Sequence, residues 1–198
     1  MTLMRTRCAV SIALAVLVFT GCGASAPARF YTLQSNATAD GLPPASYGIV
    51  VAQVSVPAVV DRPQFVVQVA PNRVEIDEFN RWAAPLGETI ADAVATDLGV
   101  RLGTPNVATA MRASFAPTYR VTIDVQRFNS IAGEAAVVEA VWAVTTVASG
   151  RIRSGKTIAR ESVQGDGFDA LAAAHSRAVT QLTRDIATAI RNAEAAAR

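Results

Sequence analysis

Cysteine, histidine and lysine are nearly absent from this chain of 198 residues, which has only Cys8, Cys22, His175 and Lys156 of these three types. We expect Cys8 to be removed with an N-terminal signal, so the mature chain has too few thiols for an internal disulfide or a cysteine-based metal site. One histidine is a weak basis for a metal centre or a catalytic triad. We therefore predict no metal and no cofactor, and interpret His175 as a partly buried helix residue with one hydrogen bond.

Charge of either sign is not in excess. The 18 basic and 16 acidic residues give a formal charge of +2, and Arg5 and Arg7 account for the whole difference. A neutral mature chain lacks the basic surface that nucleic-acid binding needs. It also lacks a polybasic segment for anionic lipid. We predict no nucleic-acid partner.

Motifs of nucleophilic and phosphate chemistry are missing as well. The chain contains neither Gly-x-Ser-x-Gly nor Ser-x-x-Lys, and it has no glycine-rich phosphate loop. Glu75 and Asp77 would share one face of a strand and form a carboxylate pair, although a solvated acidic face is the simpler interpretation. An envelope hydrolase would require these two acids to converge with His175 in a cleft. We predict that the protein is not an enzyme.

The apolar run at residues 8–19 is too short to span a bilayer, which takes about 20 residues. Two arginines precede it, as in a secretory signal. Residues 19–22, Phe-Thr-Gly-Cys, resemble a lipobox, although its first residue is aromatic where an aliphatic one is usual. We predict a lipoprotein signal peptide at 1–21 and acyl lipid, such as palmitate, on Cys22. The alternative is an ordinary cleaved signal with an incidental cysteine.

The remaining chain is predicted to hold a lipidated tether with a short extended segment at 22–46 and a single domain at 47–198. Helices are predicted where apolar residues recur at helical spacing, at 86–102 and 168–196. Strands are predicted at residues 47–56, 64–69, 74–77, 106–110, 118–126, 135–148 and 156–164. A hairpin loop is expected at 150–155 and a bulge near Arg127. This order favours an α+β fold, with a mostly antiparallel β-sheet and two amphipathic helices packed on one face.

One stretch is dense in polar, aromatic and arginine residues, whereas the rest of the chain is rich in alanine and valine. Arginine and tryptophan are enriched at binding hot spots, so this stretch is a candidate partner-binding surface. The alternative is that Trp82 packs beneath the start of the helix and that the arginines pair with nearby acids. The candidate residues are Arg62, Gln64, Asn72, Arg73, Arg81 and Trp82.

The same stretch resembles the PqiC/YmbA-like lipoproteins. The lipobox is followed by Phe-Tyr-Thr-Leu at 30–33, Asp-Arg-Pro-Gln at 61–64, Asn-Arg-Val-Glu at 72–75 and Glu-x-x-Arg-Trp-Ala-x-Pro-Leu at 78–86. The resemblance covers nearly the whole mature chain. Ala84 stands where the family often has an acid.

The resemblance implies a non-catalytic periplasmic lipoprotein anchored in the outer membrane. Such proteins work with an MCE-domain protein that bridges the two membranes, and with inner-membrane transporter components. The chain would dock the outer-membrane end of that bridge. Gly23, rather than an aspartate, follows the lipidated cysteine and is consistent with outer-membrane sorting. The alternative function is a periplasmic lipid carrier, which needs an apolar cavity of several hundred Å³. A homo-oligomer is possible in either case.

Overall fold

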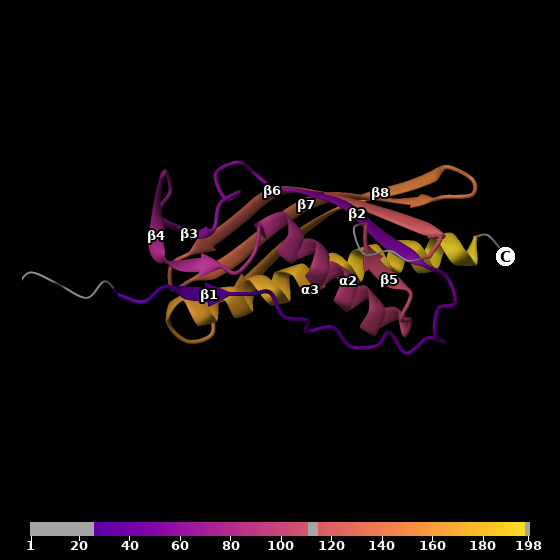
Figure 1. Ribbon diagram of the computed structural model, residues 1–198, viewed down its shortest axis with the longest axis horizontal. Coiled ribbons are helices and arrows are strands. Elements are labelled where there is room, and N and C mark those ends of the chain that lie inside the picture. Colours follow the sequence, from indigo (N-terminus) through magenta and orange to yellow (C-terminus); the bar gives the residue numbers. More distant parts are fainter. Residues whose placement is uncertain (1–25, 111–114, 197–198) are drawn as a thin grey trace, which may run out of the picture.

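The computed structural model describes residues 26–110 and 115–196. Within them, a curved eight-stranded sheet is covered on one face by two helices (Figure 1). The predicted α+β class is confirmed. The elements are β1 (Arg29–Tyr31), β2 (Ile49–Ser55), β3 (Gln64–Ala70), β4 (Arg73–Trp82), α2 (Leu86–Leu102), β5 (Val107–Thr109), β6 (Tyr119–Ile131), β7 (Ala135–Thr146), β8 (Arg151–Ser162) and α3 (Gly167–Ala195).

The sheet is mixed, which corrects the mostly antiparallel arrangement expected. β3–β4, β6–β7 and β7–β8 are antiparallel, whereas β1–β4, β2–β5, β2–β6 and β3–β6 are parallel. The reason lies in β6, which is long enough to pair with two strands along one edge. β2 pairs with residues 119–124 of β6, and β3 pairs further along at 130–131 in the same direction. The expected bulge is present, between Val125 and Arg127.

Three strand boundaries lie five residues from the predicted ones, and one of them is the end of β6, which continues to Ile131 instead of ending at residue 126. β4 continues to Trp82, through residues expected to connect to the helix. β8 begins at Arg151, inside the loop expected at 150–155, because residues 151–155 pair with the end of β7. The turn between them is at 147–150, where Gly150 has the left-handed φ of 65° that favours glycine.

The core lies between the sheet and the helices. The apolar stripe of α2 packs on β2 and β5, and that of α3 packs on β7 and β8, with the two helices also in contact. Leu86–Leu102 is the α2 range that the helical spacing predicted, and it ends at left-handed Gly103. The largest fully buried apolar side chains are Ile49, Phe65, Leu86, Ile90, Leu98, Leu102, Tyr119, Leu182, Ile186 and Ile190.

The segment before β2 belongs to the packed domain, although the sequence assigned it to the tether. β1 forms a parallel ladder with β4. Residues 32–46, which we call the N-terminal strap, then run along the helices (Figure 1). The Asp40 N–H donates to the Arg101 carbonyl at 3.0 Å, and the Ala45 N–H donates to the Leu102 carbonyl at 2.9 Å. The packed domain therefore begins at β1 and not at residue 47.

Candidate functional site

The candidate surface lies at the end of the molecule where the N-terminal segment joins the sheet. Tyr31 of β1 and Trp82 of β4 are register partners, and both are buried. The indole of Trp82 stacks on Phe65, with ring centroids 4.3 Å apart, and Phe65 meets Tyr31 edge to face at 5.3 Å. Apolar aromatic contacts therefore hold β1, β3 and β4 together.

Trp82 is 4% exposed, so its side chain packs inside and does not form a contact surface. This burial agrees with the packing alternative for Trp82, although the rings that it contacts belong to β3, β6 and α3. Its backbone N–H donates to the Pro63 carbonyl at 2.7 Å, which holds the β2–β3 connection against β4. Phe128 meets the indole edge to face, at 5.8 Å between ring centroids.

The other candidate residues are accessible. Asn72 and Arg73 are exposed at the β3–β4 turn, while Arg62, Gln64 and Arg81 are half-buried. Arg81 and Gln64 share one acidic partner, Glu78. Arg81 Nε donates to the Glu78 carbonyl at 2.7 Å and Gln64 Nε2 donates to its carboxylate at 3.3 Å. Within the described residues, the buried Nε of Arg62 has no hydrogen-bond partner.

Asp77 lies at a bulge in β4. In the ladder with β3, Asp77 pairs with Phe65 and Arg81 pairs with Gln64, so the bulge falls between Asp77 and Arg81. The Oδ1 atom of Asp77 accepts the N–H groups of Phe79 and Asn80, at 2.9 and 2.7 Å. Burial pushes the pKa of Asp77 up, but these hydrogen bonds outweigh burial and the pKa is lowered. Asp77 is thus a structural carboxylate committed to backbone donors.

His175 is fully buried, more so than predicted. Its Nε2 lies 2.8 Å from Ser130 Oγ, and its ring stacks on Phe128 at 3.9 Å between centroids. Burial lowers the pKa of His175 to about 3, so the imidazole is neutral at physiological pH. His175 is buried against Phe128 and Trp82, whereas Glu75 is exposed on β4. His175, Glu75 and Asp77, which a hydrolase would need together, therefore share no cleft.

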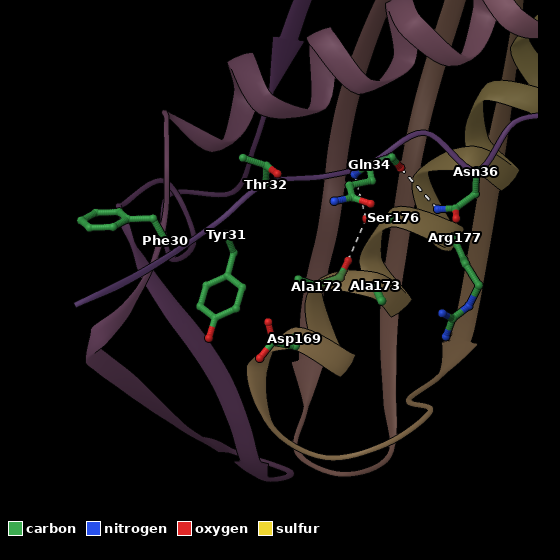
Figure 2. Close-up of a pocket in the computed structure, with 10 residues that line it drawn as sticks. All are labelled: Phe30, Tyr31, Thr32, Gln34, Asn36, Asp169, Ala172, Ala173, Ser176 and Arg177. Atoms are coloured by element: carbon green, nitrogen blue, oxygen red, sulfur yellow. Dashed lines mark hydrogen bonds between the residues drawn. The ribbon is translucent and has the colours of Figure 1, made fainter. Parts of the chain in front are cut away.

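A pocket of about 290 Å³ separates the start of the strap from the first half of α3 (Figure 2). Gln34 donates its backbone N–H to Ser176 Oγ at 3.1 Å, and that hydroxyl donates to the Ala172 carbonyl at 2.9 Å. Asp169 and Arg177 line the same space. The lining is more polar than apolar, and so does not suit an acyl chain.

A second groove, of about 520 Å³, lies between β2 and the start of α2. Val54, Val56 and Ala91 give it an apolar floor, while Asp61 and Glu88 add carboxylates to its rim. It is open to solvent, and the core beside it is filled by close-packed apolar side chains. In the described part of the chain, no group of three His, Cys, Asp or Glu side chains is placed to hold a metal ion.

Sequence reasoning missed the contribution of the N-terminal segment to this end of the molecule. The adjacent aromatic residues Phe30 and Tyr31 were a usable signal for a strand. In the structure the ring of Phe30 is exposed and that of Tyr31 is buried. Among the described residues, no helix is long and apolar enough to cross a membrane. Cys22 precedes the described residues.

The family described as ABC-type transport auxiliary lipoprotein component matches residues 31–187, and the chain belongs to it. This confirms the resemblance seen in the sequence. Protein XCC0632 from Xanthomonas campestris has a similar fold, with a TM-score of 0.71 and 24% identity over 86% of this chain and 100% of its own. The crystal structure of an uncharacterized protein is similar too, with a TM-score of 0.68 and 21% identity over 83% and 99% of the two chains. No functionally curated protein matches.

Proposed function

We propose that this protein is a non-catalytic lipoprotein of the outer membrane that docks the outer-membrane end of a periplasmic MCE-domain bridge in an ABC-type lipid transport system. The family match at residues 31–187 carries the proposal, because it associates nearly the whole domain with auxiliary lipoproteins of ABC-type transport. The PqiC-like sequence pattern supports the MCE partner. Lipid on Cys22 holds the domain at the membrane, and Gly23 favours the outer one.

The packed interior favours docking over lipid carriage. A carrier must enclose acyl chains in an apolar cavity of several hundred Å³. Here Leu98 of α2, Leu182 and Ile186 of α3 and Val121 of β6 are all buried in the space where such a cavity would lie. The grooves of the described surface are open, and their rims carry polar groups.

Two arginines at the tethered end are the candidate partner contacts. Arg73 lies at the β3–β4 turn with its side chain exposed, and Arg62 has an unpaired buried Nε among the described residues. Arginine pairs in a fixed fork with carboxylates and so suits a binding surface. This end also lies nearest the anchor, where the outer-membrane end of a bridge would arrive.

Crosslinking and co-purification from membranes test the proposal. Wild-type protein should recover an MCE-domain protein, and Arg62→Ala and Arg73→Ala should each reduce that recovery. Arg151→Ala, an exposed arginine at the start of β8, is the matched control and should leave recovery unchanged. Cys22→Ser should release the protein from the membrane fraction. The size of the captured complex reports any homo-oligomer.

Two results would contradict the proposal. Repeated failure to recover an MCE-domain partner from membranes that contain the protein would remove the docking function. If capture survives while the arginine variants lose thermal stability, the surface is structural. Trp82→Ala is an example of a structural variant. Because the Trp82 side chain is buried, its loss should lower thermal stability, whatever its effect on capture.

A further inference from the structure

We propose that an apolar strip on the outer face of β1 and β4 contacts the lipid surface of the membrane that carries the anchor. This rests on the lipidation of Cys22 in the proposed function, but not on the MCE partner. The strip comprises Phe30, Val74, Ile76 and Phe79, which are 64%, 48%, 43% and 45% exposed.

Phe30 and Phe79 lie on one face because the β1–β4 ladder fixes their directions. Tyr31 pairs with Trp82, and both side chains point into the core. Successive side chains of a strand alternate between its faces, so Phe30 and its partner Arg81 point the other way. Phe79 precedes Arg81 by two residues and shares that outer face. Figure 2 shows the Phe30 ring directed away from Tyr31.

The other two members of the strip share this face. Ile76 pairs with Val66 and Val74 pairs with Gln68 across the β3–β4 ladder. Phe65 precedes Val66 and points to the core, where it stacks on Trp82. The face that holds Ile76 and Val74 is therefore the one turned away from the helices. The strip thus follows β4 for most of its length and is extended by β1.

The length of the tether places this strip near the bilayer. Arg29, the first residue of β1, lies seven positions after Cys22, so seven residue-to-residue steps join them. At about 3.4 Å per residue they reach at most about 24 Å. β1 is fixed in the sheet, so the anchor holds a rigid face, and not a flexible tail, close to lipid. In Figure 1 the chain enters β1 at the same end as the β3–β4 hairpin.

The chemistry of the strip suits the membrane interface. Aromatic and aliphatic side chains enter the boundary between headgroups and acyl chains, while neighbouring arginines keep their charged ends at headgroup level. Arg29 and Arg73 are exposed at the same end. Because the mature chain is neutral, electrostatics alone would not bring the domain to the surface. The lipid anchor keeps the domain close to the membrane, and the strip then determines which face of the domain contacts the lipid.

Exposure alone does not mark such a site. Ile152 and Ile158 of β8 are 64% and 65% exposed, as much as Phe30. They are not adjacent, because Ser154 and Lys156 lie between them on that face of β8. Ile152 also lies at the β7–β8 hairpin, at the end of the molecule opposite β1 (Figure 1). It is therefore a matched control for the strip.

A fluorescent label on single cysteines tests the contact. The signal carries Cys8 away and lipid occupies the Cys22 thiol, so Phe79→Cys and Ile152→Cys each give the mature lipoprotein one reactive thiol. Each variant is labelled with an environment-sensitive nitrobenzoxadiazole dye. It is then placed in vesicles of phosphatidylethanolamine and phosphatidylglycerol, with or without brominated phosphatidylcholine. A label at position 79 should shift to the blue and lose intensity to brominated lipid, whereas a label at 152 should do neither.

Equal responses at 79 and 152, or no quenching at 79, would overturn the inference. A blue shift at 79 that brominated lipid does not quench would also overturn it, because the strip would then be covered by protein, either a second copy or a partner. Phe30→Cys repeats the readout on the neighbouring strand. The docking proposal is tested separately, since quenching at 79 without MCE recovery, or recovery without quenching, removes only one of the two.

Discussion

Arg191 of α3 donates two hydrogen bonds to the carboxylate of Asp40, at 2.9 and 3.2 Å, across 151 positions of sequence. Both side chains are largely buried, at 19% and 12% exposure. The pair fastens the N-terminal strap to the far half of α3. Burial pushes the pKa of Asp40 up, but the hydrogen bonds from Arg191 and from the Leu42 N–H outweigh burial, and the pKa is lowered.

Asp40→Ala should therefore reduce the free energy of unfolding by about 2 kcal/mol, because it leaves the Arg191 guanidinium buried without its partner. Urea denaturation at pH 7 measures this loss. The wild-type advantage is present above the ordinary aspartate pKa of 3.8 and should disappear as pH falls below it. Glu134→Ala removes an exposed ion pair with Arg160 and is the control, with an expected loss below about 0.5 kcal/mol. Equal losses for the two variants would show that the strap does not depend on this pair.

His175 should make the protein sensitive to mild acid. The folded state keeps the imidazole neutral down to about pH 3, while the unfolded chain takes up a proton near 6.5. The unfolded state thus binds more protons between these values, and the free energy of unfolding should fall by up to about 1.4 kcal/mol per pH unit as pH decreases. Thermal melts of wild type and His175→Gln from pH 7 to 4 measure this slope. The variant should have the shallower slope even if it is less stable at pH 7, and parallel slopes would contradict the prediction.

Asp97 of α2 should have the opposite dependence on pH. It is 1% exposed and accepts the Thr180 hydroxyl at 2.8 Å, yet burial raises its pKa above the ordinary value of 3.8. The folded state therefore holds its proton longer than the unfolded chain, and stability is lost as pH rises from 3.8 through the folded pKa. As pH rises through that range, the melting temperature of Asp97→Asn should increase relative to that of the wild type. Asp92→Asn, on the more exposed face of α2, is the control. A difference in melting temperature between Asp97→Asn and wild type that does not change with pH would contradict the prediction.

Gly155 of β8 should not tolerate alanine. It is the register partner of Trp142 in β7, and an added Cβ would lie closer than 3.0 Å to three atoms of the indole ring. The indole Nε1 donates to Thr157 at 3.1 Å, and Thr157 donates to Asp185 of α3 at 2.6 Å. Moving the ring would break this chain, so Gly155→Ala should cost about 1 to 3 kcal/mol in chemical denaturation.

Ser154→Ala, the exposed neighbour of Gly155 on the same strand, is the matched control. Its denaturation midpoint should stay near that of the wild type. If Gly155→Ala has the wild-type midpoint and unchanged tryptophan fluorescence, then β7 and β8 can separate enough to admit the methyl group.

The regular elements were largely predictable because their signals are local. Leu86, Ile90, Val94, Leu98 and Leu102 recur at helical spacing, and all five are buried where α2 packs on the sheet. Strict alternation identified the first part of β6. The hairpin loop at 150–155 was wrong because two glycines and a serine suggested a turn, while pairing with Trp142 keeps Gly155 in the strand.

The candidate surface was only partly predictable. Arg73 and Asn72 lie at an exposed turn, as their composition suggested, but Trp82 packs on Phe65 from a distant strand. An aromatic residue beside polar neighbours has the same local pattern whether it faces solvent or the core. Its direction depends on β1, which pairs with β4 about fifty positions later in the chain.

The sequence by itself determined the helix ranges and the family resemblance, and it predicted the secretory signal and the neutral charge of the mature chain, since each depends on residue types at short spacing. Only the tertiary structure decided that β2 and β3 run parallel to β6, that the strap lies on the helices, and that Phe30 and Phe79 share an exposed face. Those features depend on pairings between distant segments. Such pairings are selected by the summed burial and hydrogen bonding of the whole fold, which no local pattern specifies.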